Sequence, residues 1–171
     1  MEKRDVVVYS EDYKKLVDAT ALKDKYYEID ERVEEICKEA FKGCDKLEEI
    51  VMPKKLKKID SEAFQGCSSL TKLTLPDSVA RIDGLAFCGC SGLTELTLPN
   101  SVKSIGDGAF ADCSDLSKIT SLAEIPPVCG SGVFDRVNKT NCELIVPEGS
   151  VAAYTRAEDW NKFSNIRGFS K

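Results

Sequence analysis

Apolar side chains recur along the chain with a fixed step of 23 residues, and polar side chains fill the positions between them. In residues 70–76, apolar and polar positions alternate before a proline, which is typical of a short strand. A repeat of this length predicts a solenoid, in which each unit buries its apolar face against its neighbours. The positions that keep the step are Phe41, Phe64, Phe87 and Phe110; Cys44, Cys67, Cys90 and Cys113; Leu47, Leu70, Leu93 and Leu116; and Ile36, Ile59, Ile82 and Ile105.

Stacking at this period places equivalent residues above one another, with parallel strands about 4.8 Å apart. The phenylalanines would then form a ladder inside the column. Phe87 lies between two repeats, whereas Phe134 lies where the register loosens and is expected to contribute less to stability. The four cysteines of the repeat would be small buried side chains at a tight turn. Because stacked equivalents point side by side rather than toward one another, we expect these four thiols to stay free.

Four further cysteines lie off this ladder. Cys37 and Cys88 align with polar residues of other repeats and are expected at the surface. Cys129 and Cys142 flank the least regular repeat. They are the only pair that we consider for a disulfide, and only in an oxidising compartment.

The repeats divide the chain into three parts. Residues 1–26 carry no full repeat and are predicted to form an N-terminal cap, because a solenoid needs a polar end. Within this cap, residues 5–9 predict a short strand, and residues 14–22 fit a strand or a helix. Residues 27–147 hold the repeats, of which the last is degenerate, and residues 148–171 form the C-terminal cap.

The C-terminal end has its own signals. Val133 and Phe134 repeat the Ala-Phe pair with a step of 24, so the degenerate repeat still contributes to the core. Ser150 can cap a short helix that extends from Val151 to about Asp159. Trp160 would then seal the open end of the core.

The outward-facing positions of the predicted strands form two rows. In one of them acidic and basic residues alternate, so neighbouring strands would pair charges that contribute about 0.2–1 kcal/mol each. Support of the strand register and contact with a partner are both compatible with this pattern. As candidate partner-binding residues on the concave face we take Glu49, Val51, Lys72, Thr74, Glu95, Thr97, Lys118 and Thr120.

A basic run follows the second predicted strand. It comprises Lys54, Lys55, Lys57 and Lys58, and stacking would bring Arg81 beside it. The simpler interpretation of this basic run is a solvated face, and the more specific one is a binding site for anions or glycosaminoglycans.

Composition excludes several functions. The 171 residues carry a formal net charge of −5, which argues against general affinity for nucleic acid. Histidine is absent, so catalytic sites of the Ser-His-Asp and Cys-His types and zinc sites with histidine are excluded. The eight cysteines lack the clustering of a metal site. We therefore predict no catalytic, metal or cofactor-binding residues, and no enzymatic activity.

No apolar run approaches the roughly 18–20 residues that a membrane-spanning helix needs, so no membrane insertion is predicted. The charged start, Met1 to Asp5, is not followed by the apolar core of a signal peptide. We expect either a cytosolic protein or a mature fragment with an added methionine.

The full motif, Leu-x-x-Leu-x-Leu-Pro-x-x-Val-x-x-Ile-x-x-x-Ala-Phe-x-x-Cys, closely resembles the BspA-like leucine-rich repeats of bacterial surface proteins. Residues 144–154, followed by Trp160 and Phe163, are also similar to the usual last segment of that family. The chain departs from the pattern at Asp30, which replaces the proline, and in the lysine-rich turn at residues 54–58.

The resemblance implies a right-handed, curved α/β leucine-rich-repeat solenoid of short parallel strands, loops and short helical turns, with a C-terminal capping helix. It also implies a secreted or cell-surface, non-enzymatic module for protein binding or adhesion in host–microbe contact. Partners of such proteins include host extracellular-matrix proteins of the fibronectin kind and other cell surfaces. The family has no catalytic residues to transfer, and a passive spacer within a larger surface protein is the alternative function.

Overall fold

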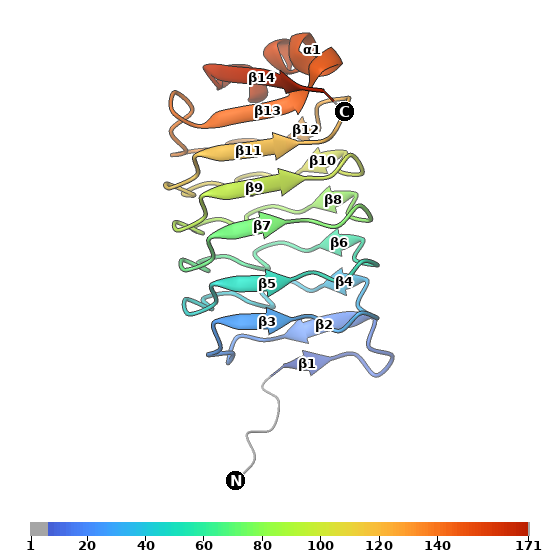
Figure 1. Ribbon diagram of the computed structural model, residues 1–171. Coiled ribbons are helices and arrows are strands. Elements are labelled where there is room, and N and C mark those ends of the chain that lie inside the picture. Colours follow the sequence, from blue (N-terminus) through green and yellow to red (C-terminus); the bar gives the residue numbers. More distant parts are fainter. Residues whose placement is uncertain (1–6, 171) are drawn as a thin grey trace.

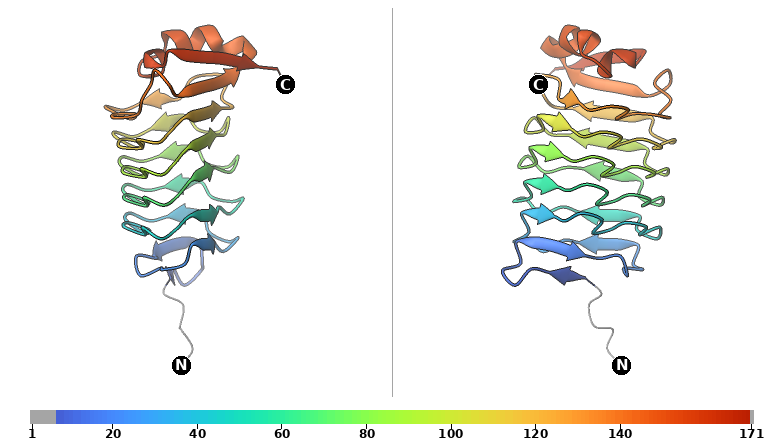
Figure 2. Two further views of the ribbon diagram at one scale, coloured as in Figure 1. Left: turned by 60° about the vertical axis from the view of Figure 1, so that its left-hand side comes forward. Right: turned by 180° about the vertical axis from the view of Figure 1, so that it is seen from behind.

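The computed structural model describes residues 7–170. The chain winds into a column of stacked turns, and each turn contributes strands to two opposite faces (Figures 1 and 2). The front sheet, which faces the viewer in Figure 1, comprises β3 (Tyr26–Glu28), β5 (Glu49–Val51), β7 (Lys72–Thr74), β9 (Glu95–Leu98), β11 (Lys118–Ser121), β13 (Glu143–Pro147) and β14 (Asn165–Phe169). The back sheet comprises β1 (Val8–Tyr9), β2 (Lys15–Asp18), β4 (Glu35–Ile36), β6 (Lys58–Ile59), β8 (Arg81–Ile82), β10 (Ser104–Ile105) and β12 (Val128–Cys129).

The back sheet is continuous and follows the period of the sequence. Its strands are parallel from β2 to β12, and β1 is added antiparallel to β2 at the N-terminal edge. Ile59 is paired with Ile36 on one side and Ile82 on the other, and Ile82 is paired with Ile105. The predicted fold class, a leucine-rich-repeat solenoid of short parallel strands with one C-terminal helix, is confirmed.

The predicted phenylalanine ladder forms the centre of the core. Neighbouring ring centroids are 4.8 Å apart for Phe41 and Phe64, 5.0 Å for Phe64 and Phe87, and 5.3 Å for Phe87 and Phe110. These rings are nearly parallel, with interplanar angles of 7°, 4° and 2°. The centroid distances are close to the spacing of neighbouring strands, so the backbone stacking sets the ring stacking.

The cysteines of the repeat are buried free thiols, as predicted, and each makes a hydrogen bond that sequence reasoning missed. The Sγ of Cys90 donates to the carbonyl oxygen of Phe64 in the preceding turn, at 3.3 Å, and Cys113 does the same to Phe87 at 3.3 Å. Burial raises the pKa of the Cys44 thiol to about 11 and that of Cys113 to about 12, so both stay protonated at neutral pH. A weak donor of this size suits a turn that has a carbonyl within reach.

The other cysteines are also free thiols in the structure. Cys37 and Cys88 are half-buried rather than fully at the surface. The thiol of Cys129 lies near the carbonyl oxygen of Pro127, at 3.8 Å, and is not bonded to Cys142.

The ambiguous segment at residues 14–22 contains a strand, β2, and not a helix. Ala19 follows it, and its N–H donates to the carbonyl oxygen of Ala40 as the N–H of Phe41 donates to that of Ala63. Ala19 therefore takes the ladder position one turn before Phe41 and ends the ring stack with a small side chain. The strand expected at residues 5–9 is found as β1, although Asp5 and Val6 lie outside the described residues.

The C-terminal cap begins with η1 (Glu148–Ser150), α1 (Val151–Arg156) and η2 (Trp160–Lys162). The helix is shorter than predicted. Ser150 precedes it, but its hydroxyl donates to the carbonyl oxygen of Glu124 at 2.8 Å instead of capping the helix. The last strand, β14, pairs in parallel with β13 and was not predicted.

Trp160 closes the core as expected. Its ring is fully buried, 5.1 Å from Phe134, and its Nε1 donates to the carbonyl oxygen of Pro127 at 2.9 Å. Phe134 also contacts Phe163 at 5.2 Å and Phe110 at 6.0 Å. The sequence suggested that Phe134 is loosely held, whereas the structure surrounds it with three aromatic rings.

Candidate functional site

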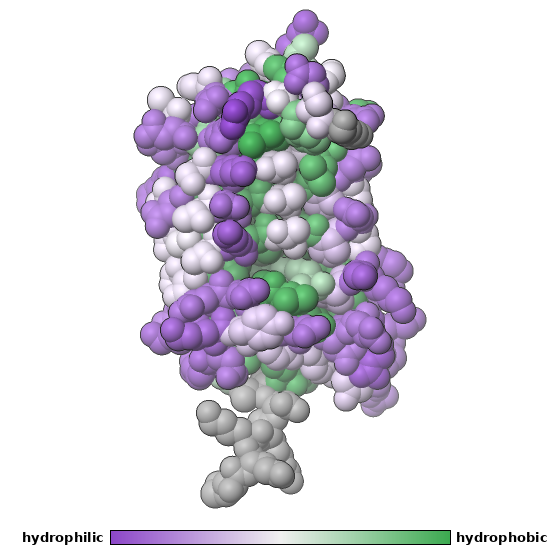
Figure 3. Space-filling view, viewed as in Figure 1, coloured by the Kyte–Doolittle hydropathy of each residue, from purple (hydrophilic) through white to green (hydrophobic). Residues whose placement is uncertain are grey.

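The front sheet presents the predicted partner-binding residues in two columns. The register pairs Lys72 with Glu95 and Glu95 with Lys118, and it pairs Thr74 with Thr97 and Thr97 with Thr120. On this face of the surface, Figure 3 shows a pale column beside a hydrophilic one. We call these columns the charged column (Glu49, Lys72, Glu95 and Lys118) and the threonine column (Val51, Thr74, Thr97 and Thr120).

The charged column is available to solvent. The ammonium group of Lys72 is 3.9 Å from the carboxylate of Glu95, and both side chains are well exposed. At such a site an ion pair contributes little to stability, at most about 1 kcal/mol. Glu143 and Arg167 form a second ion pair nearer the C-terminal cap, in which the Glu143 side chain is largely buried. The weak pair of Lys72 and Glu95 can exchange for contacts with a partner.

The front sheet is interrupted between β5 and β7, which corrects the expectation that all front strands pair. Strands β3 and β5 form a two-stranded piece, and β7, β9, β11, β13 and β14 form a separate five-stranded piece. In the intact part, the N–H of Leu75 donates to the carbonyl oxygen of Thr97 at 3.3 Å. The equivalent bond from Met52 to Thr74 is missing among the described residues. Glu49 and Val51 therefore lie on a different piece from the other six candidate residues.

The interruption exposes apolar side chains. Ile50 and Met52 are half-buried, whereas their equivalents Leu73 and Leu75 are 2% and 3% exposed. Val51, which replaces the threonine of its column, is 38% exposed. Sequence reasoning missed this feature, and its only signals were valine in the threonine column and methionine in a leucine position.

The predicted basic run is largely neutralised. Lys57 forms an ion pair with Glu34, and Arg81 contacts Asp83 at 2.7 Å. The ammonium group of Lys58 lies among three carboxylates, at 3.3 Å from Asp60, 3.6 Å from Asp83 and 3.7 Å from Glu35. Only Lys54 and Lys55 of the five make no ion pair in the part of the chain that the structure describes. This arrangement favours the simpler interpretation, a solvated face.

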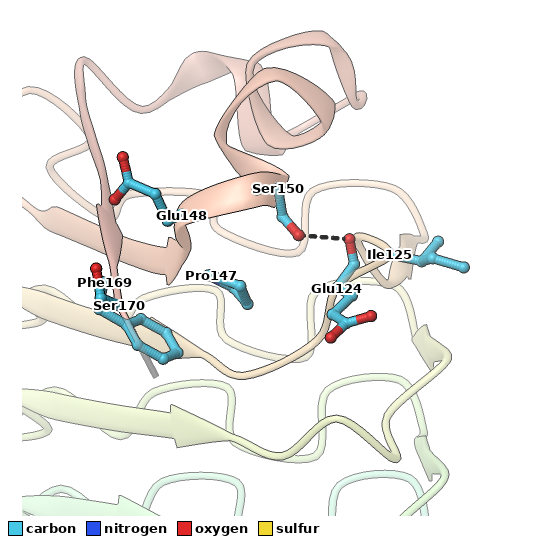
Figure 4. Close-up of a pocket in the computed structure, with 8 residues that line it drawn as sticks. Glu124, Ile125, Pro147, Glu148, Ser150, Phe169 and Ser170 are labelled. Atoms are coloured by element: carbon cyan, nitrogen blue, oxygen red, sulfur yellow. Dashed lines mark hydrogen bonds between the residues drawn. The ribbon is translucent and has the colours of Figure 1, made fainter.

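A separate hollow lies at the C-terminal cap (Figure 4). It has a volume of about 660 Å³ and is lined by residues that include Ile125, Pro147 and Phe169. The bond from Ser150 to Glu124 crosses its wall. Among residues 7–170, no three ligating side chains converge in a way that could hold a metal ion. No helix in the same range is both long and apolar enough to span a membrane.

The repeats match the sequence profile of the BspA type leucine-rich repeat region in six copies, over residues 21–141. No functionally curated protein matches the chain. The structure is similar to the crystal structure of the pneumococcal vaccine antigen PcpA, with a TM-score of 0.76 and 20% identity over 98% of this chain and 47% of the antigen. This chain thus spans about half the length of that antigen.

Two further solved structures are similar. The leucine-rich repeat protein of T. pallidum has a TM-score of 0.68 and 23% identity, over 95% of this chain and 94% of that protein. A leucine-rich cell surface protein from Faecalibacterium prausnitzii A2-165 has a TM-score of 0.55 and 25% identity, over 97% of this chain and 46% of that protein.

Proposed function

Because the chain belongs to the BspA-type leucine-rich repeat family, we propose that it is a non-enzymatic module that binds a protein partner through its front sheet. The observation that carries this proposal is the pair of outward-facing columns on β7, β9 and β11, which strand pairing and the buried core behind them hold in register. A surface of this kind is already ordered before binding, so binding costs little conformational entropy. Solenoids commonly use such extended sheets for recognition.

We further propose a secreted or cell-surface location in a bacterium. The similarity to a protein described as a leucine-rich cell surface protein supports this location. A partner from the host extracellular matrix, such as fibronectin, or from another cell surface fits a mixed polar face with both charges. The alternative is a passive spacer, which would use the rigidity of the column and bind nothing through this face.

The test compares two sets of substitutions. The front set changes Thr74, Glu95, Thr97 and Lys118 to alanine. The control set on the back changes Lys57, Arg81, Lys103 and Ser104 to alanine, which removes three positive charges, whereas the front set removes one charge of each sign. Binding of each protein to immobilised fibronectin, laminin and collagen is measured by surface plasmon resonance, and binding to host epithelial cells by flow cytometry.

We expect saturable binding to at least one surface, weakened about tenfold by the front set, which corresponds to about 1.4 kcal/mol. The back set should bind as the unmodified protein does, and both sets should change the melting temperature little because they change exposed or half-buried side chains outside the apolar core. Absence of saturable binding to every surface would favour the spacer. Equal loss in both sets would place the site elsewhere.

A further inference from the structure

Two hollows that share Val51 and Met52 lie on either side of β5. One lies between β5 and β7, has a volume of about 420 Å³ and is lined by apolar groups of Ile50 and Leu75 as well. The other lies on the opposite side of Val51, toward β3, with a volume of about 380 Å³. Each can accept a side chain of leucine size. The gap affects only the front sheet, because the back sheet behind it is unbroken and keeps the column continuous.

The outward face of the β3–β5 piece is acidic beside these hollows. Its four outward-facing side chains are Tyr26, Glu28, Glu49 and Val51. None of the four is basic, and Tyr26 is 50% exposed. In the described structure neither carboxylate forms an ion pair, although the hydroxyl of Tyr26 donates to Glu28 at 3.5 Å. Two carboxylates and an exposed tyrosine ring together suit a cation.

Basic residues border this acidic face. Lys72 lies across the gap from Glu49 and forms its ion pair with Glu95 of the next strand. Lys54 and Lys55 lie in the turn after β5, in the hollow that Glu31 also lines. Glu28 and Glu49 thus keep negative charge that no ion pair of the described structure neutralises, on strands β3 and β5 beside the apolar hollows.

We propose that this gap docks an extended segment of a partner protein in which an aliphatic residue and a lysine or arginine are two positions apart. The aliphatic side chain would occupy the hollow at Val51 and Met52, and the basic group would lie over Glu49 and Tyr26. Glu49 and Val51 are themselves two positions apart on one strand face, and an extended peptide has the same period of two and rise of about 3.3 Å per residue. The spacing of the segment therefore matches the spacing of its site.

This inference rests on the proposed function, because it assigns a place and a chemistry to part of the partner-binding face. Steric and charge complementarity select the occupant. A segment with acidic residues would meet Glu28 and Glu49, and a segment without an aliphatic residue would leave Ile50, Val51 and Met52 in water. A second copy of the chain is the main competing occupant, and its binding is an outcome of the test.

The experiment uses three fluorescently labelled nine-residue peptides. Their central five residues are lysine-threonine-leucine-threonine-lysine, the same with serine in place of leucine, and the same with glutamate in place of both lysines. Lysines on both sides of the leucine make the result independent of chain direction. Binding to the full chain is measured by fluorescence anisotropy at low and at physiological salt.

Two substitutions probe the site, and one is a matched control. Glu49→Lys reverses the charge beside the gap, and Val51→Thr restores the residue found at Thr74, Thr97 and Thr120 while removing apolar surface. Glu158→Lys makes the same charge reversal at an exposed position of the C-terminal cap, away from the gap and outside the two columns. All three positions face outward, so melting curves should show folded proteins.

We expect the first peptide to bind about tenfold more tightly than the other two, since each lacks one of the two matched groups. Glu49→Lys and Val51→Thr should each weaken its binding by about tenfold, and Glu158→Lys by less than about twofold. Equal weakening by Glu49→Lys and Glu158→Lys would show general attraction to an acidic protein and overturn the inference. Equal binding of the serine peptide, or no saturable binding of any peptide, would also overturn it.

Sedimentation velocity completes the test. If the protein forms a dimer and Glu49→Lys makes it monomeric, a second copy of the chain occupies the gap, and the inference is overturned. If the peptides fail while the front set still loses binding to matrix proteins or cells, only this inference fails. If neither binds, the proposed function fails with it.

Discussion

Removing one rung of the aromatic ladder should destabilise the whole column. Phe87 is fully buried between Phe64 at 5.0 Å and Phe110 at 5.3 Å. The backbone holds both neighbours in place, since the N–H of Phe64 donates to the carbonyl oxygen of Ala86 at 2.7 Å and that of Phe110 to the carbonyl oxygen of Val133 at 3.0 Å. The space left by Phe87→Ala therefore cannot collapse easily. We expect a loss of about 4–5 kcal/mol, the upper part of the range for such substitutions.

Urea denaturation followed by circular dichroism measures this loss. The dependence of the unfolding free energy on urea concentration should stay constant, so that only the midpoint moves. Ile125→Ala is the control, because Ile125 is 76% exposed and its truncation should change stability by less than about 0.5 kcal/mol. A loss below about 1 kcal/mol for Phe87→Ala, with an unchanged slope, would refute the view that the ring stack supports the core.

Three further predictions concern backbone and thiols. Burial raises the pKa of the Cys113 thiol to about 12, so the folded state keeps its proton, whereas the unfolded state loses it near pH 8.5. The contribution of this thiol to stability should therefore be full below that pH and fall above it. Cys113→Ala should reduce the fall of the melting temperature with rising pH, and an identical fall would contradict the assignment. Gly66 has φ of +75°, and a Cβ added there would have no atom closer than 3.9 Å, so Gly66→Ala should destabilise the protein by about 1–2 kcal/mol through backbone conformation alone. Gly149 has no positive φ, so Gly149→Ala should be close to neutral in the same urea assay. Equal losses of stability for the two variants would contradict this reasoning. Thiol titration of the unfolded, unreduced protein should find all eight thiols free, and a count of six would instead indicate a bridge between Cys129 and Cys142.

The period of the sequence predicted the core because stacking places each residue above its equivalent. Phe87 and Cys90 could be placed in this way from the 23-residue step alone. The gap beside Val51 could not, because valine and methionine are acceptable strand residues and the loss of pairing depends on the path of the backbone. Strand β14 was missed because residues 165–169 show only weak alternation, and its place depends on tertiary pairing with β13. The carbonyl partner of each buried thiol likewise depends on the turn geometry and not on the residue type.

For the candidate site, the repeat pattern predicted the composition of the two columns but not their division. Lys72, Thr97 and Lys118 were correctly expected on neighbouring strands. The neutralisation of Lys58 was not foreseen, because its carboxylate neighbours come from three different turns. Sequence patterns predict which residues share a face of the solenoid. Ion pairs between different turns cannot be predicted in this way, because they depend on the positions of the side chains.

The use of the front sheet as the binding face is tested most directly by site-specific photo-crosslinking. A photoreactive amino acid is placed at Thr97 on the front sheet, or at Ser104 on the back sheet as the control, and each protein is irradiated on host cells or on immobilised fibronectin. We predict crosslinked adducts from position 97 and none above background from position 104. Adducts from position 104 alone, or equal yields from both positions, would contradict binding through the front sheet.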